Sequence, residues 1–215
     1  MNDSLRLAEL LSARLCHDLS GLLGSLIGVL EIAREEQPDS ETLALAEETA
    51  VELAQRLKLL RAAWGIDGEE LDLIQLQTFA DALSNSRRLR LDLNGLDPDA
   101  VFPPPASKLV LNLLLLAAES LPGGGIVALS GSPASNVVVT ISGPRAAWPA
   151  GFSNWLVDEA AAREAVTKNP RHLQGPLTAL LARAHKLHLS MLMPAGAGAG
   201  SEGEMLPPLV LSFRT

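Results

Sequence analysis

Residues 8–33 read AELLSARLCHDLSGLLGSLIGVLEIA, and this stretch decides the fold of the N-terminal third of the chain. Its apolar residues recur at three- and four-residue spacing, which is the period of an amphipathic helix. On such a helix the main apolar stripe covers about 80° of arc, and His17 projects roughly 200° from its centre. The stripe consists of Ala8, Leu11, Leu15, Leu19, Leu22, Leu26, Val29 and Ala33. We therefore predict a long helix whose histidine points outward.

The neighbours of His17 on its side of this helix are mostly small. They are Ala13, Ser20, Gly21, Gly24 and Gly28. A glycine inside a helix costs about 1 kcal/mol relative to alanine, so several in one helix need a compensating reason. Close packing of a second helix of the same fold is one reason, and docking of a partner is the other. Leu10 is the one bulky residue on this side, and it belongs either to a docking surface or to a domain contact.

Composition restricts the class of protein. The chain has 215 residues, 47% of them hydrophobic, and a formal net charge of −8 without a basic stripe, so we expect no nucleic-acid partner. The single cysteine, Cys16, excludes an intramolecular disulfide, and we expect it to be a small buried hydrophobe. The longest apolar run, residues 109–118, is far shorter than the roughly 20 residues of a membrane span. With no basic region before an apolar stretch at the N-terminus, we expect a cytoplasmic protein without a membrane contact.

A second amphipathic helix is predicted over residues 41–64, after a turn at Pro38-Asp39-Ser40. The two helices form a hairpin whose broad apolar faces cannot both be buried within one chain. Pairing with the hairpin of a second copy would bury them, so the sequence predicts a homodimer held by a four-helix bundle.

After Gly65-Ile66-Asp67-Gly68 the long helical pattern gives way to short mixed elements. We place a domain boundary here, between residues 1–66 and residues 67–215, and predict an α+β second domain. Glycine-rich turns at residues 123–125 and 131–133 separate its elements, the second joining two antiparallel strands. We predict helices over residues 76–86, 106–120, 154–167 and 173–186, and strands over residues 89–93, 126–130, 137–142, 187–193 and 206–213.

Two short motifs, one in the predicted hairpin and one in the predicted α+β domain, resemble motifs of a known family. His17-Asp18-Leu19 is similar to the phosphoacceptor box of two-component histidine kinases, in which an acidic residue follows the histidine. Asn112-Leu113-Leu114 looks like the start of their nucleotide-binding asparagine box. Over most of its length the chain therefore resembles a histidine kinase, which implies a dimerisation hairpin followed by an ATPase-like α/β sandwich.

The departures from the kinase pattern concern the nucleotide site. Leu116 stands where the kinase box has a second asparagine that ligates magnesium, and it offers no oxygen to a hard cation. Ser142-Gly143-Pro144-Arg145 stands where the adenine-recognising aspartate should follow its strand, and no glycine-rich phosphate lid lies between Arg145 and Leu173. We therefore expect no ATP binding. A kinase-like body without a nucleotide site resembles the ChpT-type histidine phosphotransferases, as does the stretch of residues 170–183.

That resemblance implies a function in a two-component phosphorelay. His17 would accept phosphate from the receiver aspartate of a hybrid histidine kinase and pass it to the receiver of a response regulator. The chain would bind no cofactor of its own, because the receiver brings the magnesium. It would be a phosphotransfer intermediate rather than an ATP-dependent kinase. Two alternatives stay open: a divergent ATP-dependent histidine kinase, and a catalytically silent dimer that only binds receivers.

The neighbours of His17 suggest roles in transfer. Asp18 can hold one ring N–H and fix the tautomer, or it can instead bond within the bundle. Arg14, one turn earlier, can neutralise phosphate or meet the acidic pocket of a receiver, or it can be an ordinary solvated arginine. Together with Arg14, we expect Ser20, Gly21 and Gly24 to form the partner surface. Gly21 also stands where kinases with phosphatase activity commonly carry threonine or asparagine, which favours transfer over hydrolysis.

Overall fold

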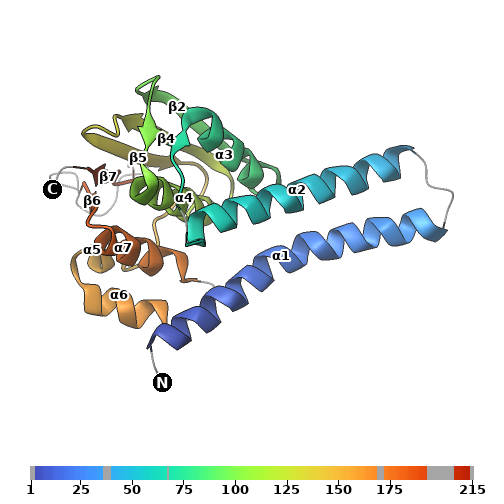
Figure 1. Cartoon of the computed structure of the whole chain (residues 1–215), viewed down its shortest axis with the longest axis horizontal. Coiled ribbons are helices and arrows are strands. Elements are labelled where there is room, and N and C mark those ends of the chain that lie inside the picture. Colours follow the sequence, from blue (N-terminus) through green and yellow to red (C-terminus); the bar gives the residue numbers. More distant parts are fainter. Residues whose placement is uncertain (1–2, 36–39, 67, 169–171, 193–205, 214–215) are drawn as a thin grey trace.

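The computed structural model describes residues 3–35, 40–66, 68–168, 172–192 and 206–213. Two long helices, α1 (Asp3–Glu35) and α2 (Ser40–Trp64), form an antiparallel hairpin. The linked ends of the hairpin extend away from the rest of the molecule, and the opposite ends rest on an α+β domain (Figure 1). This confirms the predicted α+β fold with an N-terminal hairpin. Pro38 and Asp39 of the predicted turn lie outside the described residues, and Ser40 begins α2.

A mixed five-stranded sheet forms one layer of the α+β domain, with strand order β2-β4-β5-β7-β6. Strand β2 pairs parallel with β4, and every other neighbouring pair is antiparallel. In β5 alternate residues are buried, so Val137, Val139 and Ile141 face the core, as a half-covered strand requires. The strands are β2 (Leu89–Leu96), β4 (Gly125–Gly131), β5 (Asn136–Ser142), β6 (His188–Met191) and β7 (Leu209–Ser212).

The helix α4 (Pro104–Glu119) lies at the centre of the domain. Its residues from Ala106 to Ala118 are buried all round except for Lys108, which is typical of a helix enclosed on every side. It shares one core with the sheet, with α3 (Leu73–Arg87) and with Leu59, Leu60 and Ala63 at the end of α2. The hairpin and the domain are thus joined through a common apolar core.

A second, smaller core anchors the start of α1. Leu7 and Leu11 pack against Val166 at the end of α6 (Glu159–Val166), against Leu177 of α7 (Gln174–Ala184) and against Leu173, which immediately precedes α7. Both helices of the hairpin therefore contact the α+β domain, and the middle of α1 is held close to it.

The structure corrects two sequence predictions in this domain. The single helix predicted over residues 154–167 is two helices, α5 (Phe152–Val157) and α6, separated by Asp158 in an extended conformation. Its carboxylate accepts hydrogen bonds from the backbone N–H groups of Ala160 and Ala161 and so caps α6. The other error is an omission: β1 (Leu71–Asp72) and β3 (Val101–Phe102) form a separate antiparallel ribbon too short to have a sequence pattern.

The remaining elements agree with the prediction to within a few residues. The turn at Gly131 joins two antiparallel strands, as predicted, and Gly131 has a φ of 103°, which favours glycine. The two final strands pair with each other over shorter ranges than predicted.

Candidate functional site

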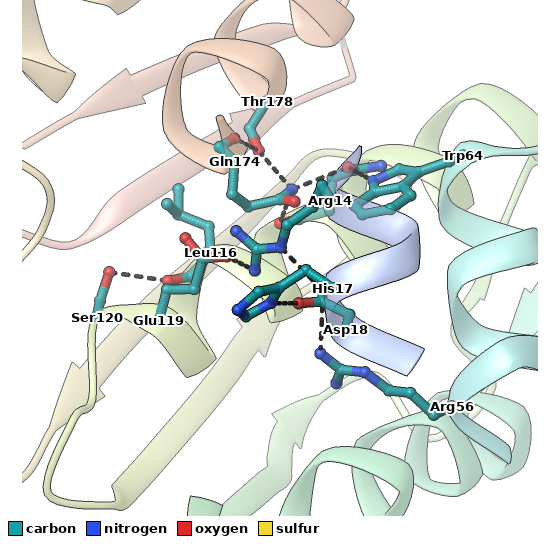
Figure 2. Close-up of polar contacts among 11 residues, drawn as sticks. Arg14, His17, Asp18, Arg56, Trp64, Leu116, Glu119, Ser120, Gln174 and Thr178 are labelled. Carbon is teal, nitrogen blue, oxygen red and sulfur yellow. Dashed lines mark hydrogen bonds and ion pairs between the residues drawn. The ribbon is translucent and has the colours of Figure 1, made fainter. Parts of the chain in front are cut away.

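His17 lies in the first half of α1 and its side chain is 69% exposed, which confirms the outward direction predicted from the helical period. Its Nδ1 lies 3.3 Å from Oδ1 of Asp18 (Figure 2). Asp18 is acceptor-only as a carboxylate, so this contact favours the tautomer in which Nδ1 carries the proton. The lone pair of the imidazole is then at Nε2, on an exposed side chain.

The Asp18 carboxylate divides its two oxygens between His17 and two arginines. Oδ2 accepts a hydrogen bond from Nε of Arg14 at 2.9 Å and lies 3.7 Å from Nη2 of Arg56 on α2. The side chain of Asp18 is only 8% exposed. The two contacts expected as alternatives for Asp18 are therefore both present: its carboxylate contacts the His17 ring and also bonds to arginines of the hairpin.

Arg14 is buried, which corrects the expectation of a surface arginine or a partner-facing one. Its guanidinium bridges two carboxylates: Nε donates to Asp18, and Nη2 donates to Oε1 of Glu119 at 2.5 Å. Burial alone would lower the pKa of Arg14, but attraction to Glu119 and the hydrogen bond to Asp18 outweigh that effect and raise its pKa. Arg14 is a fixed cation between α1 and the C-terminal end of α4.

A second polar network lies beside this one and centres on Asn112, which is completely buried. Its Oδ1 accepts from Nε1 of Trp64 at 3.1 Å and from Nε2 of Gln174 at 2.9 Å, and its Nδ2 donates to the carbonyl of Ala63. Gln174 in turn donates to Thr178. Asn112 thus joins α2, α4 and α7, and every polar atom of its amide is engaged within the protein.

Ser20, Gly21 and Gly24, the other residues expected at a partner surface, are exposed on α1. A side-chain carbon at Gly21, Gly24 or Gly28 would meet nothing within 4 Å, so no close packing within this chain requires these glycines. Leu10 is buried within the chain, so its side chain does not form part of an exposed docking surface.

Cys16 is exposed, and the expectation of a buried cysteine was wrong because its position on α1 faces solvent beside His17. The hydroxyl of Ser20 donates to the Cys16 carbonyl at 2.6 Å, one turn earlier in the helix.

Within the described ranges, no group of three or more histidine, cysteine, aspartate or glutamate side chains is placed to hold a metal ion. Leu116 is buried and carries no oxygen in its side chain. A cleft of about 450 Å³ lies between the end of α2 and the start of α3, with Lys58, Phe79 and Leu111 in its lining. His17 is not among the residues that line it.

Sequence reasoning missed Arg56 and Glu119, the residues that complete the environment of Asp18 and Arg14. Glu119 ends the apolar run of α4, and a carboxylate at a helix C-terminus is disfavoured by the helix dipole. This unfavourable position could have indicated from the sequence that the Glu119 carboxylate pairs with a cationic side chain from another element. Arg56 gave no such signal, since an arginine on an amphipathic helix is ordinarily solvated.

Comparison with known proteins identifies relatives with a phosphotransfer function. A family model described as the histidine phosphotransferase C-terminal domain matches residues 74–196. The chain is 28% identical to the protein phosphotransferase ChpT of Brucella abortus (strain 2308) over 194 residues, which are 87% of this chain and 90% of that protein.

The fold was also compared with solved structures. A structure titled as that of a bacterial phosphotransferase matches with a TM-score of 0.68 and 26% identity, over 97% of this chain and 95% of the other. The Acinetobacter baumannii histidine kinase AdeS matches with a TM-score of 0.42 and 13% identity, over 91% and 96% of the two chains. By its family match, which spans more than half of its residues, this chain belongs to the histidine phosphotransferase family.

Proposed function

We propose that this histidine phosphotransferase works in a two-component phosphorelay and carries the phosphoryl group on His17. One observation carries the assignment: an exposed imidazole whose Nδ1 faces a buried carboxylate, so that Nε2 is the nitrogen open to a partner. The other histidines, His172, His185 and His188, lie in the α+β domain, and no ion pair with a carboxylate is found at them in the described part of the chain.

The proposed reaction needs little from the protein beyond position and charge, because phosphoryl transfer passes through a loose transition state. The lone pair of Nε2 attacks the phosphorus of the aspartyl phosphate of a receiver. The N–P bond forms as the O–P bond breaks, and the bonding electrons leave with the receiver's carboxylate. The proton on Nδ1 stays in its hydrogen bond to Asp18, which stabilises the positive charge that develops on the ring. Asp18 is thus the orienting residue.

The partners we propose are the receiver domain of a hybrid histidine kinase as donor and the receiver of a response regulator as acceptor. The exposed, small residues beside His17, namely Ser20, Gly21 and Gly24, leave room for a receiver to approach closely. Arg14 is not part of this surface, since its guanidinium is buried against Asp18 and Glu119. We propose that Mg²⁺ comes with the receiver and that the chain holds no cofactor.

The alternative of an ATP-dependent kinase is less well supported by the residues at the equivalent of the nucleotide site. Asn112, which resembles the first residue of the asparagine box, is buried, and its side-chain amide is hydrogen-bonded to groups of α2 and α7. Leu116 is buried beside it on the same helix. Neither side chain is available to a nucleotide phosphate or its metal ion.

We also propose a homodimer with a four-helix bundle. Large apolar side chains on the outer part of the hairpin are each about half exposed, although apolar residues at such spacing on two adjacent helices are ordinarily buried. A second hairpin of the same kind would cover them. They are Leu23, Ile27 and Leu30 on α1 and Leu43, Leu45 and Val51 on α2.

Among the described residues, α1 over Leu5–Arg34 is long and apolar enough to cross a membrane by length and composition. Its charged residues favour a different role, since Arg14 is bonded to Glu119 on α4 and Asp18 pairs with Arg56 on α2. We therefore propose a cytoplasmic protein in which the apolar surface of α1 meets a second copy.

The test of this function is transfer of labelled phosphate from a purified, phosphorylated receiver domain, beside an incubation with Mg-ATP alone. We expect label from the receiver and none from ATP. Label from ATP alone would favour the divergent kinase, whereas stable binding of receivers without any transfer would favour the silent dimer.

A further inference from the structure

A continuous chain of polar contacts runs from α4 to the imidazole of His17. Glu119 accepts from Nη2 of Arg14, Nε of Arg14 donates to Oδ2 of Asp18, and Oδ1 of Asp18 contacts Nδ1 of His17 (Figure 2). The side chains before the histidine are 19%, 10% and 8% exposed, whereas His17 is 69% exposed. The exposed imidazole of His17 is therefore linked to charged side chains that are largely shielded from solvent.

The rigid guanidinium of Arg14 couples the position of Glu119 to the orientation of the Asp18 carboxylate. A guanidinium is planar, with its donors in a fixed fork, so fixing Nη2 on one carboxylate sets the direction in which Nε points. Glu119 thus determines where the Nε–H of Arg14 meets Asp18. That bond occupies Oδ2 and leaves Oδ1 turned toward His17.

The placement of Glu119 is costly for α4 itself. It is the last residue of the helix, where the dipole repels a carboxylate. The C-terminal end of α4 is capped by Ser120: its backbone N–H bonds the carbonyls of Leu116 and Ala117, and its hydroxyl bonds the carbonyl of Leu116. The ion pair with Arg14, which is 105 positions away in the sequence, compensates for this cost.

From these observations we infer that Glu119 is a positioning residue for phosphotransfer: it acts through Arg14 and Asp18 to hold the Nδ1–H tautomer of His17. The α+β domain, which has no nucleotide role in the proposed function, then has a role at the phosphoacceptor. This inference rests on His17 being the acceptor. Glu119 itself touches neither the imidazole nor the phosphoryl group.

The variant that tests this is Glu119→Gln, which keeps the shape of the side chain but removes its charge. The matched control is Glu164→Gln on α6, where an exposed glutamate pairs only with the exposed Lys168 in the described contacts. Inorganic phosphoramidate serves as the phosphodonor, so that the rate reports on the imidazole and not on receiver docking.

We expect phosphorylation of His17 to slow by about tenfold in Glu119→Gln, the scale at which indirect partners of an oriented histidine act. The control should match the wild type.

Two further readouts separate positioning from a general loss of structure. The ¹⁵N chemical shifts of the His17 ring, assigned by their absence in His17→Gln, should report mainly the Nδ1–H form in the wild type and a mixture in Glu119→Gln. In a double-mutant cycle, Arg14→Gln with Glu119→Gln should be no slower than Arg14→Gln alone, because both act along one chain. Glu119→Asp, which keeps the charge, should recover part of the rate.

The outcomes distinguish this inference from the proposed function. If the wild type takes no phosphate on His17, the proposed function fails. If the wild type is phosphorylated on His17 and a folded Glu119→Gln reacts at the same rate with an unchanged tautomer, the positioning role is wrong. Additive losses in the double mutant would likewise overturn it, and if Glu119→Gln does not fold, Glu119→Asp and the tautomer measurement still decide the question.

Discussion

At the scale of single residues, the site is built from one exposed histidine and a set of buried charged side chains. The direction of His17 follows from helical periodicity alone, and it was predictable. The burial of Arg14 was not, because it depends on Glu119, which tertiary packing brings from α4, 105 positions away in the sequence. The side of a helix on which a residue lies can be predicted from the local sequence. An ion pair between segments far apart in the sequence cannot.

The orienting role of Asp18 leads to a prediction for Asp18→Asn. The amide can offer an N–H to His17 where the carboxylate only accepts, so the wrong tautomer becomes favourable. We expect transfer from a phosphorylated receiver to slow by about 10- to 100-fold. Rapid-quench kinetics at saturating receiver measure this.

A matched control for Asp18→Asn is Asp81→Asn. Asp81 is exposed on α3, where its carboxylate accepts from Gln77 one turn earlier, and this variant should transfer at the wild-type rate. Equal rates for Asp18→Asn and the wild type would show that Asp18 has only a structural role.

At the scale of helices and strands, polar residues decide where elements end and how they are joined. Most elements were predictable from periodicity, including both hairpin helices and the buried helix α4. The break between α5 and α6 was not, because alanine-rich sequence on both sides favours a continuous helix and only the cap at Asp158 interrupts it. The ribbon of β1 and β3 forms by pairing of two segments that are distant in the sequence, and a local sequence pattern cannot predict such pairing.

The cap at Asp158 should be measurable in stability. Asp158→Ala removes the acceptor for the N–H groups of Ala160 and Ala161, so we expect the free energy of unfolding to fall by about 1 kcal/mol. Asp158→Ser keeps an acceptor at the same position and should lose little. Urea unfolding followed by circular dichroism measures both; an equal loss in the two variants would mean that the cap is not the cause.

The Asn112 network should have a larger effect, because it joins three helices. Asn112→Ala leaves the indole N–H of Trp64, the amide of Gln174 and the carbonyl of Ala63 without this partner in the interior. Each buried polar group left unsatisfied costs about 1–3 kcal/mol, so we expect a total loss of about 3 kcal/mol. Unfolding in urea measures it, with Asn154→Ala, an exposed asparagine on α5, as the control. A loss under 1 kcal/mol would contradict the role of Asn112 as the joint between these helices.

At the scale of the whole molecule, the hairpin is anchored at one end and apolar at the other. Its base shares the core of the α+β domain, and its outer part presents large apolar side chains to solvent. The sequence predicted this surplus of apolar surface, and one chain does not bury it. The proposed association with a second copy would account for both facts.

Association predicts a specific effect of Ile27→Glu. The new carboxylate would be buried in the interface of the four-helix bundle, where an unpaired charge is strongly unfavourable. We expect a dimer for the wild type and a monomer for Ile27→Glu in sedimentation velocity at equal concentrations. Val157→Glu, at an exposed apolar residue of α5, should remain dimeric. A wild type that stays monomeric throughout the micromolar range would contradict the bundle.

If His17 carries the phosphoryl group, as we propose, phosphate should be found on its imidazole after reaction with a phosphorylated receiver. The protein would be phosphorylated by a receiver domain and analysed by ³¹P NMR and by mass spectrometry of its peptides. We expect an acid-labile phosphohistidine at His17, bonded through Nε2, and no phosphate on His17→Gln. Phosphate on His172, His185 or His188, or on His17→Gln at the wild-type level, would contradict it.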